Sequence, residues 1–340
     1  MPKDPLRADE VARAEAPAHR RLRIGDGIFR SSSVATSAGL IALLVGMLGV
    51  LLVAAFPTFR AFGLKFVTGT QWNPVTDQFG ALPYIYGTVV TSTIAIALAL
   101  PVSLGLALLL NEVRSGWVRN PLTVLVDLLA AIPSVVYGLW GIFVMAPALN
   151  TTLEPALGAT LGKLPLIGRL FQPTPSAGNM LNAGIILAVM VIPIITAVSR
   201  EVIATVPRDL REAALSMGAT RYEAIKMAVL PYARNGIIGA TMLGLGRALG
   251  ETIAVAMLIG NGLGISSSLL APGYTIPAVI ANEFREAGST GLHRSSLIAL
   301  AVILMLIALI LAAASRMLVR NTAERFAVKL SEVSTTLEQP

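Results

Sequence analysis

The chain has 340 residues, of which 55% are hydrophobic and only 13% are charged, with a net charge of +7 and no cysteine. A soluble globular domain carries about 25% charged residues, so this composition predicts a polytopic membrane protein. The lack of cysteine excludes disulfides, thiolate metal sites and a cysteine nucleophile. Histidine occurs only at His19 and His293, both in polar segments, which argues against haem or zinc sites built on histidine pairs. Basic residues gather at the ends of apolar stretches, a pattern that does not suggest nucleic acid binding.

Six apolar stretches are long enough to cross a bilayer as helices, which takes about 20 residues each. In chain order they are Val34–Phe56, Tyr84–Leu110, Val118–Ala146, Leu181–Val202, Gly236–Ile259 and Ser295–Leu318. The first is too long for the apolar region of a signal peptide and no clear cleavage site follows it, so we expect it to be retained. The sequence therefore predicts an all-α membrane protein with six transmembrane helices.

The distribution of basic residues predicts that both termini lie in the cytoplasm. With the N-terminus inside, 19 of the 26 Lys and Arg residues fall in inner segments and six in outer loops. Cytoplasmic loops of membrane proteins carry such an excess. The expected organisation is a cytoplasmic N-terminal segment (1–33), a six-span domain (34–318) and a cytoplasmic tail (319–340).

Three prolines interrupt predicted spans, and each can kink its helix and free a backbone carbonyl: Pro101, Pro133 and Pro193. Asp127 places a charge in the third span. It is either a partner for an arginine in another span or a local packing feature, and the sequence does not decide between the two.

The polar loop at about 203–233 predicts two short helices joined by a glycine turn. Gly218 can adopt the left-handed conformation that ends a helix. Thr220 and Glu223 form a capping box that starts the second helix. Four residues share one face of the first helix: Leu210, Ala213, Ala214 and Met217. The loop is expected to dock another protein, or alternatively to rest as an amphipathic segment on lipid headgroups.

Nothing in the sequence predicts a nucleotide site. A phosphate-binding loop ends in Gly-Lys-Ser/Thr. The single Gly-Lys pair, Gly162-Lys163, is followed by Leu164. Any energy from ATP would therefore have to come from another chain.

The fifth predicted span contains two charges, Arg247 and Glu251. An arginine at bilayer depth costs at least ~2.5–3.5 kcal/mol, so an intramembrane charge suggests function. At a spacing of i, i+4 the two side chains would pair in a helix. Small residues would pack neighbouring helices closely around them: Gly236, Ala240 and Gly244 on one face, Gly246 and Gly250 on another. In one interpretation Arg247 receives an oxyanion and Glu251 orients it. In the other, the pair is a structural clamp between helices.

The loop resembles the EAA element of binding-protein-dependent ABC importer permeases, through which a membrane subunit docks on its ATPase. The matching residues are Glu212, Ala213, Ala214, Gly218, Leu230 and Pro231. Ala228 departs from the pattern, which has isoleucine there. The resemblance implies the type I ABC importer permease fold and a role in ATPase coupling for the six matching residues.

Further strings resemble the PstC family of bacterial phosphate-specific ABC transporters over most of residues 34–320. They are Ala131–Gly138, Ile192–Thr196, Ser199–Val202 and Gly244–Thr252. The resemblance implies that Arg247 and Glu251, in the last of these strings, lie in the substrate pathway. The resemblance implies a multi-pass permease of a prokaryotic inner membrane that carries inorganic phosphate inward. It also implies three partners: a PstA-type permease, a PstB-type ATPase homodimer that binds ATP and Mg²⁺, and a PstS-type phosphate-binding protein. No catalytic residue, metal or cofactor is expected on this chain.

Three other functions remain open from the residues alone. Sulfate or molybdate would suit an arginine as well as phosphate does. An anion transporter or channel without an ATPase would also use Arg247, but it would not need the EAA spacing. A membrane-embedded enzyme is disfavoured, because the spans contain no cysteine, histidine or paired carboxylates.

Overall fold

The computed structural model describes residues 5–113, 115–165, 167–174, 176–288 and 291–337, and side chains within 29–317 apart from the same gaps. The chain divides into two compact units, residues 1–54 and 55–340. Helix α1 (Pro5–Phe62) contributes to both units, and its part Phe29–Phe62 is long and apolar enough to span a membrane. The predicted terminal segments, 1–33 and 319–340, lie mostly outside the described side chains.

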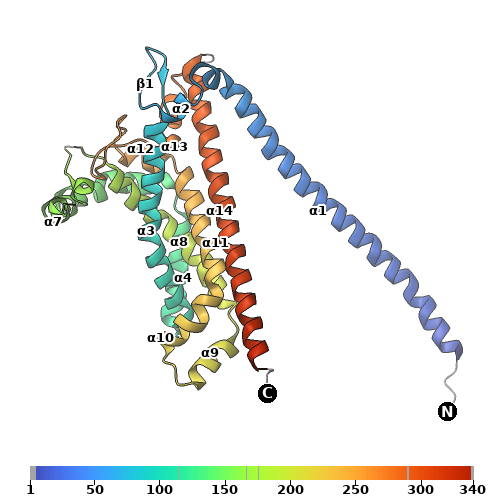
Figure 1. Cartoon of the computed structure of the whole chain (residues 1–340). Helices are drawn as coiled ribbons and strands as arrows, with labels where there is room; N and C mark the ends of the chain where they lie inside the picture. Colours follow the sequence, from blue (N-terminus) through green and yellow to red (C-terminus); the bar gives the residue numbers. More distant parts are fainter. Residues whose placement is uncertain (1–4, 114, 166, 175, 289–290, 338–340) are drawn as a thin grey trace. The chain divides into compact units, whose positions relative to one another are not determined.

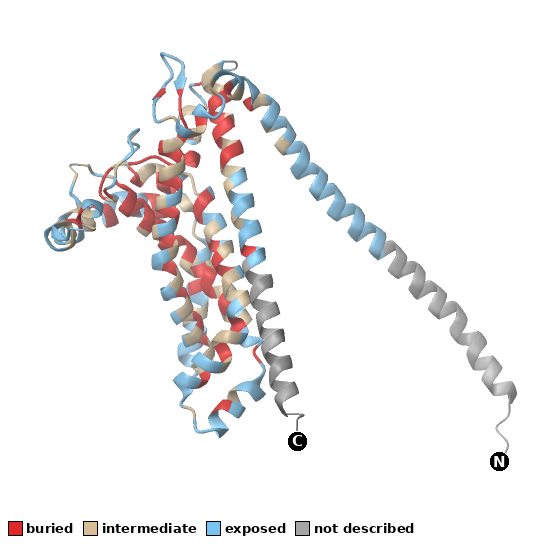
Figure 2. Cartoon of the chain, in the orientation of Figure 1, coloured by how far each residue is buried: buried red, intermediate tan, exposed pale blue. Residues whose placement is uncertain are grey.

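The second unit is a helical bundle built around α8 (Met180–Ala204). This helix packs against α3 (Leu82–Glu112) and α11 (Leu230–Gly250), while α11 also contacts α14 (Leu292–Leu337). Buried residues gather where α3, α8 and α11 meet (Figure 2). The members of this core are small or branched: Ala95, Ala99, Leu187, Val191, Ile195 and Ala240 among them. Small residues let helix backbones approach each other closely in a membrane, as the sequence predicts.

Five helical stretches of the described residues have the length and apolar composition to cross a membrane. They are Phe29–Phe62, Leu82–Glu112, Ser134–Lys163, Met180–Ala204 and Leu292–Met317. Four of them coincide with the first, second, fourth and sixth predicted spans. The third and fifth predicted spans differ from the structure.

The third predicted span, Val118–Ala146, is broken in two. Helix α4 (Gly116–Ala131) ends before Ile132 and Pro133, which are both extended, and α5 (Ser134–Trp140) begins after them. The residue before a proline is driven out of the helical region, and the proline itself has no N–H to donate. The helical stretch continues through a π-helix (Gly141–Met145), α6 (Ala146–Thr151), α7 (Leu153–Thr160) and a 3-10 turn (Leu161–Lys163). Pro101 and Pro193, in contrast, lie inside the unbroken helices α3 and α8.

The fifth predicted span, Gly236–Ile259, is also broken. Helix α11 ends at Gly250, Glu251 is extended (φ −69°, ψ 131°), and α12 (Ile253–Leu258) follows. Glycine weakens a helix by roughly 0.5–1 kcal/mol relative to alanine, so the pair Gly246 and Gly250 favours an end here. Arg247, which is near the centre of the predicted span Gly236–Ile259, therefore lies in the last turn of α11 instead of within a continuous helix.

Short elements cover the end of the bundle opposite to α9 and α10 (Figure 1). They are α2 (Lys65–Thr68), the antiparallel strands β1 (Trp72–Asn73) and β2 (Gln78–Phe79), a 3-10 turn (Gly168–Phe171) and α13 (Ile276–Glu283). The Trp72 indole N–H donates to Glu283 at 2.8 Å, and the His293 ring lies 2.9 Å from the same carboxylate oxygen. These contacts tie the hairpin to α13 and α14.

Candidate functional site

The loop between α8 and α11 folds as the sequence predicts. Helix α9 (Arg208–Ser216) ends in a turn at Gly218, whose φ is +85°, and α10 (Arg221–Ala224) follows. Thr220 and Glu223 form the expected capping box: the Thr220 N–H donates to Glu223 at 2.8 Å and the Glu223 N–H to Thr220 Oγ1 at 3.3 Å. The hydrogen bonds that the Thr220 backbone N–H and hydroxyl donate to the Glu223 carboxylate lower the pKa of Glu223, because they favour its ionised form. A π-helical turn (Ile225–Val229) then leads into α11. We call residues 207–231 the coupling element.

The residues of the EAA pattern are divided between α9, the turn at Gly218 and the first turn of α11. Ala214 is buried, whereas Glu212 and Ala213 are exposed. Leu230 and Pro231 form the half-buried first turn of α11. The predicted apolar face of α9 is therefore only partly covered within this chain. Leu210 is 41% exposed and Met217 is 82% exposed.

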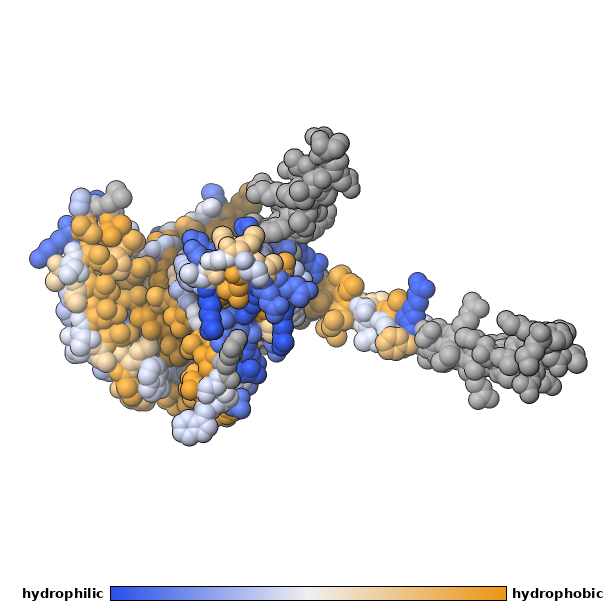
Figure 3. Space-filling model, turned by 90° about the horizontal axis from the view of Figure 1, so that it is seen from below, coloured by the Kyte–Doolittle hydropathy of each residue, from blue (hydrophilic) through white to orange (hydrophobic). Residues whose placement is uncertain are grey.

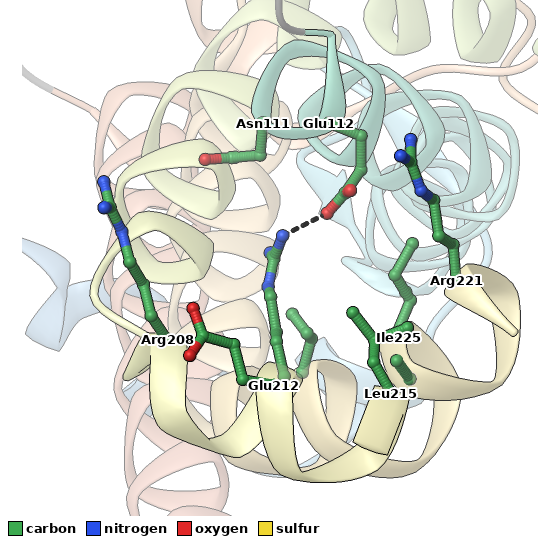
Figure 4. A pocket seen from close by; sticks show the side chains of 10 residues that line it. Asn111, Glu112, Arg208, Glu212, Leu215, Arg221 and Ile225 are labelled. Atoms are coloured by element: carbon green, nitrogen blue, oxygen red, sulfur yellow. Dashed lines mark hydrogen bonds and ion pairs between the residues drawn. The ribbon is translucent and has the colours of Figure 1, made fainter. Parts of the chain in front are cut away.

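An ion pair joins the coupling element to the end of α3. Arg211 of α9 pairs with Glu112, the last residue of α3. The Arg211 side chain points across a hollow of about 420 Å³, with Arg208 on one side of the hollow and Arg221 on the other (Figure 4). Glu112 could not be predicted from the sequence, because the two residues are 99 positions apart and no local pattern connects them. Hydrophilic side chains gather on this end of the molecule (Figure 3).

Arg247 and Glu251 do not form the predicted ion pair. The ion pairs among the described side chains are Arg211–Glu112 and His293–Glu283. Arg247 is on the surface of the chain, while Glu251 is half-buried, and its backbone N–H donates to the carbonyl of Ala248 at 3.4 Å. Because α11 ends at Gly250, Glu251 does not occupy the position one helical turn beyond Arg247 that the prediction required.

The predicted tightly packed interior around Arg247 is also wrong for this chain alone. One face of α11 packs on α8: a Cβ at Gly236 would lie 2.3 Å from Val202, and one at Gly244 would lie 2.6 Å from Ile195. A second face of α11 is open, since a Cβ at Gly239, Gly246 or Gly250 would meet no atom within 4 Å. We call Gly239, Leu243, Gly246, Arg247 and Gly250 the open face of α11. Asp127 is also exposed, so the structure does not bring it into a pair with Arg247.

Comparisons with known proteins agree with the helical bundle. Residues 99–324 match the family described as "Binding-protein-dependent transport system inner membrane component". The chain is 45% identical to the phosphate transport system permease protein PstC of Mesorhizobium japonicum, over 89% of this chain and 93% of the relative. It is 50% identical to PstC of Xylella fastidiosa, over 72% of this chain and 75% of the relative.

The arrangement of the helices also occurs in a solved transporter. The inward-facing MetNI methionine ABC transporter matches with a TM-score of 0.50 at 17% identity, over 74% of this chain and 99% of the matched chain. At that identity the likeness shows the fold, which is the type I ABC importer permease fold. Together with the apolar helices, the relatives show a multi-pass protein of the inner membrane. The chain belongs to the PstC family of phosphate transport system permeases, within the inner membrane components of binding-protein-dependent transporters.

Proposed function

We propose that this chain carries inorganic phosphate inward across the membrane, driven by ATP that a separate ATPase subunit hydrolyses. One observation carries the proposal: the coupling element runs directly into α11, and α11 presents Arg247 on its open face. From Leu230 to Arg247 the helix rises about 25 Å, at 1.5 Å per residue. A displacement of the coupling element therefore moves the helix that bears the arginine.

Arg247 is suited to receive a tetrahedral oxyanion. Its planar, positively charged guanidinium can donate two parallel hydrogen bonds. Gly246 and Gly250 keep bulky side chains away from the same face. Glu251 lies just beyond the end of α11. Its negative charge repels an anion bound at Arg247 and so limits how tightly the anion is held. Substrate is then released when the helices rock between inward-open and outward-open states.

The open face of α11 needs a covering partner. An arginine facing lipid at bilayer depth is costly, whereas one facing a water-filled path between two subunits is not. We assign this face to a second permease of the PstA type. The relatives' system further suggests a PstS-type phosphate-binding protein at the outer end and a PstB-type ATPase homodimer, which holds ATP and Mg²⁺, at the coupling element. This chain has no catalytic role in that scheme.

The proposed orientation places the coupling element and both termini in the cytoplasm. The excess of Lys and Arg in these segments favours the cytoplasmic side, and ATP is available only in the cytoplasm. The exposed Leu210 and Met217 then offer an apolar contact to the ATPase, beside Glu212 and the surrounding arginines. Glu212 and Ala213 contribute to the docking surface, the buried Ala214 and the turn at Gly218 hold its shape, and Leu230 and Pro231 join it to the rest of α11.

Uptake of radiolabelled phosphate tests the proposal. Cells that lack their own phosphate importer are supplied with this chain and its partner subunits. An excess of unlabelled phosphate should abolish uptake of label, whereas equal sulfate or molybdate should leave it unchanged. If sulfate or molybdate competes as well as phosphate does, the chain serves another oxyanion. Uptake that persists after depletion of ATP would instead support an ATPase-independent transporter.

A further inference from the structure

A second hollow lies at the same end of the bundle as the coupling element. It has a volume of about 480 Å³ and opens between the ends of α3, α4 and α8. Its polar lining consists of six residues: Asn111, Arg119, Asn120, Thr123, Arg200 and Glu201. Leu110, only 2% exposed, lines it as well. We call it the α3–α4–α8 hollow.

The charges in this hollow favour an anion. Arg119 and Arg200 contribute two positive charges and Glu201 one negative charge. None of the three belongs to an ion pair of the described side chains. Asn111 is held in place by its amide, which donates to the carbonyls of Ala107 at 2.9 Å and Arg200 at 3.1 Å. The hollow therefore keeps two unpaired guanidinium groups beside fixed polar side chains.

An exposed tryptophan beside the hollow indicates how deep the hollow lies in the membrane. Trp117, 91% exposed, lines an adjoining hollow that shares Asn120 with the first. Tryptophan is enriched at the level of the lipid headgroups. Basic pockets between transmembrane helices at that level bind phosphate-bearing headgroups. The two guanidinium groups, the Asn120 amide and the Thr123 hydroxyl offer several donors to the oxygens of such a group.

We propose that the α3–α4–α8 hollow is a binding site for a phosphate group, separate from Arg247. The group comes either from an anionic phospholipid or from inorganic phosphate, and both present the same oxygens to Arg119 and Arg200. The two sites are far apart along the bundle, because Arg247 lies about 25 Å along α11 from Leu230, whereas the hollow is at the end of the bundle where the coupling element lies. The chemistry of the site does not depend on the proposed transport function. Only its assignment to the inner leaflet does.

The test uses the full-length chain carrying Arg247→Gln, so that phosphate binding at Arg247 does not contribute to the measured signal. One arm titrates inorganic phosphate by calorimetry into chain held in nanodiscs of phosphatidylcholine alone. The other arm counts phosphatidylglycerol molecules that stay bound in native mass spectrometry of detergent-purified chain. Each arm compares Arg119→Gln with Arg200→Gln, singly and together, against Arg234→Gln. Arg234 is an exposed arginine at the same end of the bundle that lines neither hollow.

We expect the paired substitution to weaken binding of one ligand at least tenfold and Arg234→Gln to leave it unchanged. Loss in the calorimetric arm identifies inorganic phosphate as the ligand, and loss in the mass spectrometric arm identifies the lipid. Arg119→Gln, a change at an exposed position, gives the answer if the double variant does not fold. If neither ligand distinguishes these variants from Arg234→Gln, the site does not exist.

Discussion

Gly218 sets the angle between the two helices of the coupling element. Its φ of +85° lies in a region that L-residues with a side chain rarely adopt, and a Cβ there would otherwise meet open space. The constraint is therefore one of backbone conformation and not of packing. A β-branched residue in this region costs about 1–2 kcal/mol, which is relieved by rotating α10 away from α9.

We expect Gly218→Val to abolish ATP-dependent phosphate uptake while the chain still inserts in the membrane. Gly105→Ala is the matched control, since Gly105 lies within α3, is exposed and has no atom within 4 Å of a Cβ. Uptake and co-purification of the ATPase are measured for both variants. Native values for Gly218→Val would contradict the docking role of this turn.

At the scale of helices, the ion pair between Arg211 and Glu112 connects the coupling element to α3. Both side chains are about 30% exposed, at 28% and 30%, so the pair adds little to overall stability. Its effect is geometric, because it fixes α9 to the end of a helix that packs along α8. Under the proposed mechanism, motion of α9 is therefore passed to α3 as well as to α11.

Reversing this ion pair separates the geometric role from the chemical one. Glu112→Arg and Arg211→Glu, made singly, should each reduce phosphate uptake several-fold, because two like charges then face each other. The two changes together restore the pair and should recover most of the uptake. The measurement is uptake at equal membrane levels of each variant, and a double variant no better than the singles would rule out the tie.

The two glycine faces of α11 lead to different expectations. Gly244→Leu would force a side chain into Ile195 and should destabilise the chain itself by about 1–3 kcal/mol. Gly246→Leu adds a bulky side chain to the open face, where it meets no atom of this chain. The isolated chain should therefore keep its stability, while the second permease no longer fits and is lost from the complex. Thermal unfolding of the purified chain and subunit co-purification distinguish the two. Equal effects of both substitutions on the isolated chain would argue against a partner at the open face.

The elements of the coupling loop could be predicted because their signals are local. Gly218 and the Thr220–Glu223 box act within four residues, and both are found as predicted. The ends of α4 and α11 could not be predicted from hydropathy, because Ile132-Pro133 and Glu251-Thr252 interrupt the helix while apolar residues continue on both sides. The exposure of Arg247 could not be predicted either. The sequence indicates that a charge in a span must be shielded from lipid, but it does not show whether this chain or a partner shields it.

At the scale of the whole molecule, the hairpin β1–β2 and the coupling element lie at opposite ends of the bundle. The orientation in the membrane rests on the distribution of basic residues. Single cysteines test it without background, since the chain has none. A membrane-impermeant thiol reagent added to sealed cells should label Val75→Cys, at a position 92% exposed, and miss Tyr222→Cys, at one 71% exposed. The reverse pattern would contradict both the orientation and ATPase docking.

In the proposed mechanism Arg247 contacts the phosphate in transit, and phosphate uptake by charge variants of the assembled complex tests this role. Arg247→Gln should abolish uptake, and Arg247→Lys should retain only part of it, because lysine keeps the charge but loses bidentate donation. The double variant Arg247→Gln with Glu251→Gln should remain inactive, as expected for two residues that do not pair in the structure. Near-native phosphate uptake by that double variant would contradict the account and make the two charges a structural clamp.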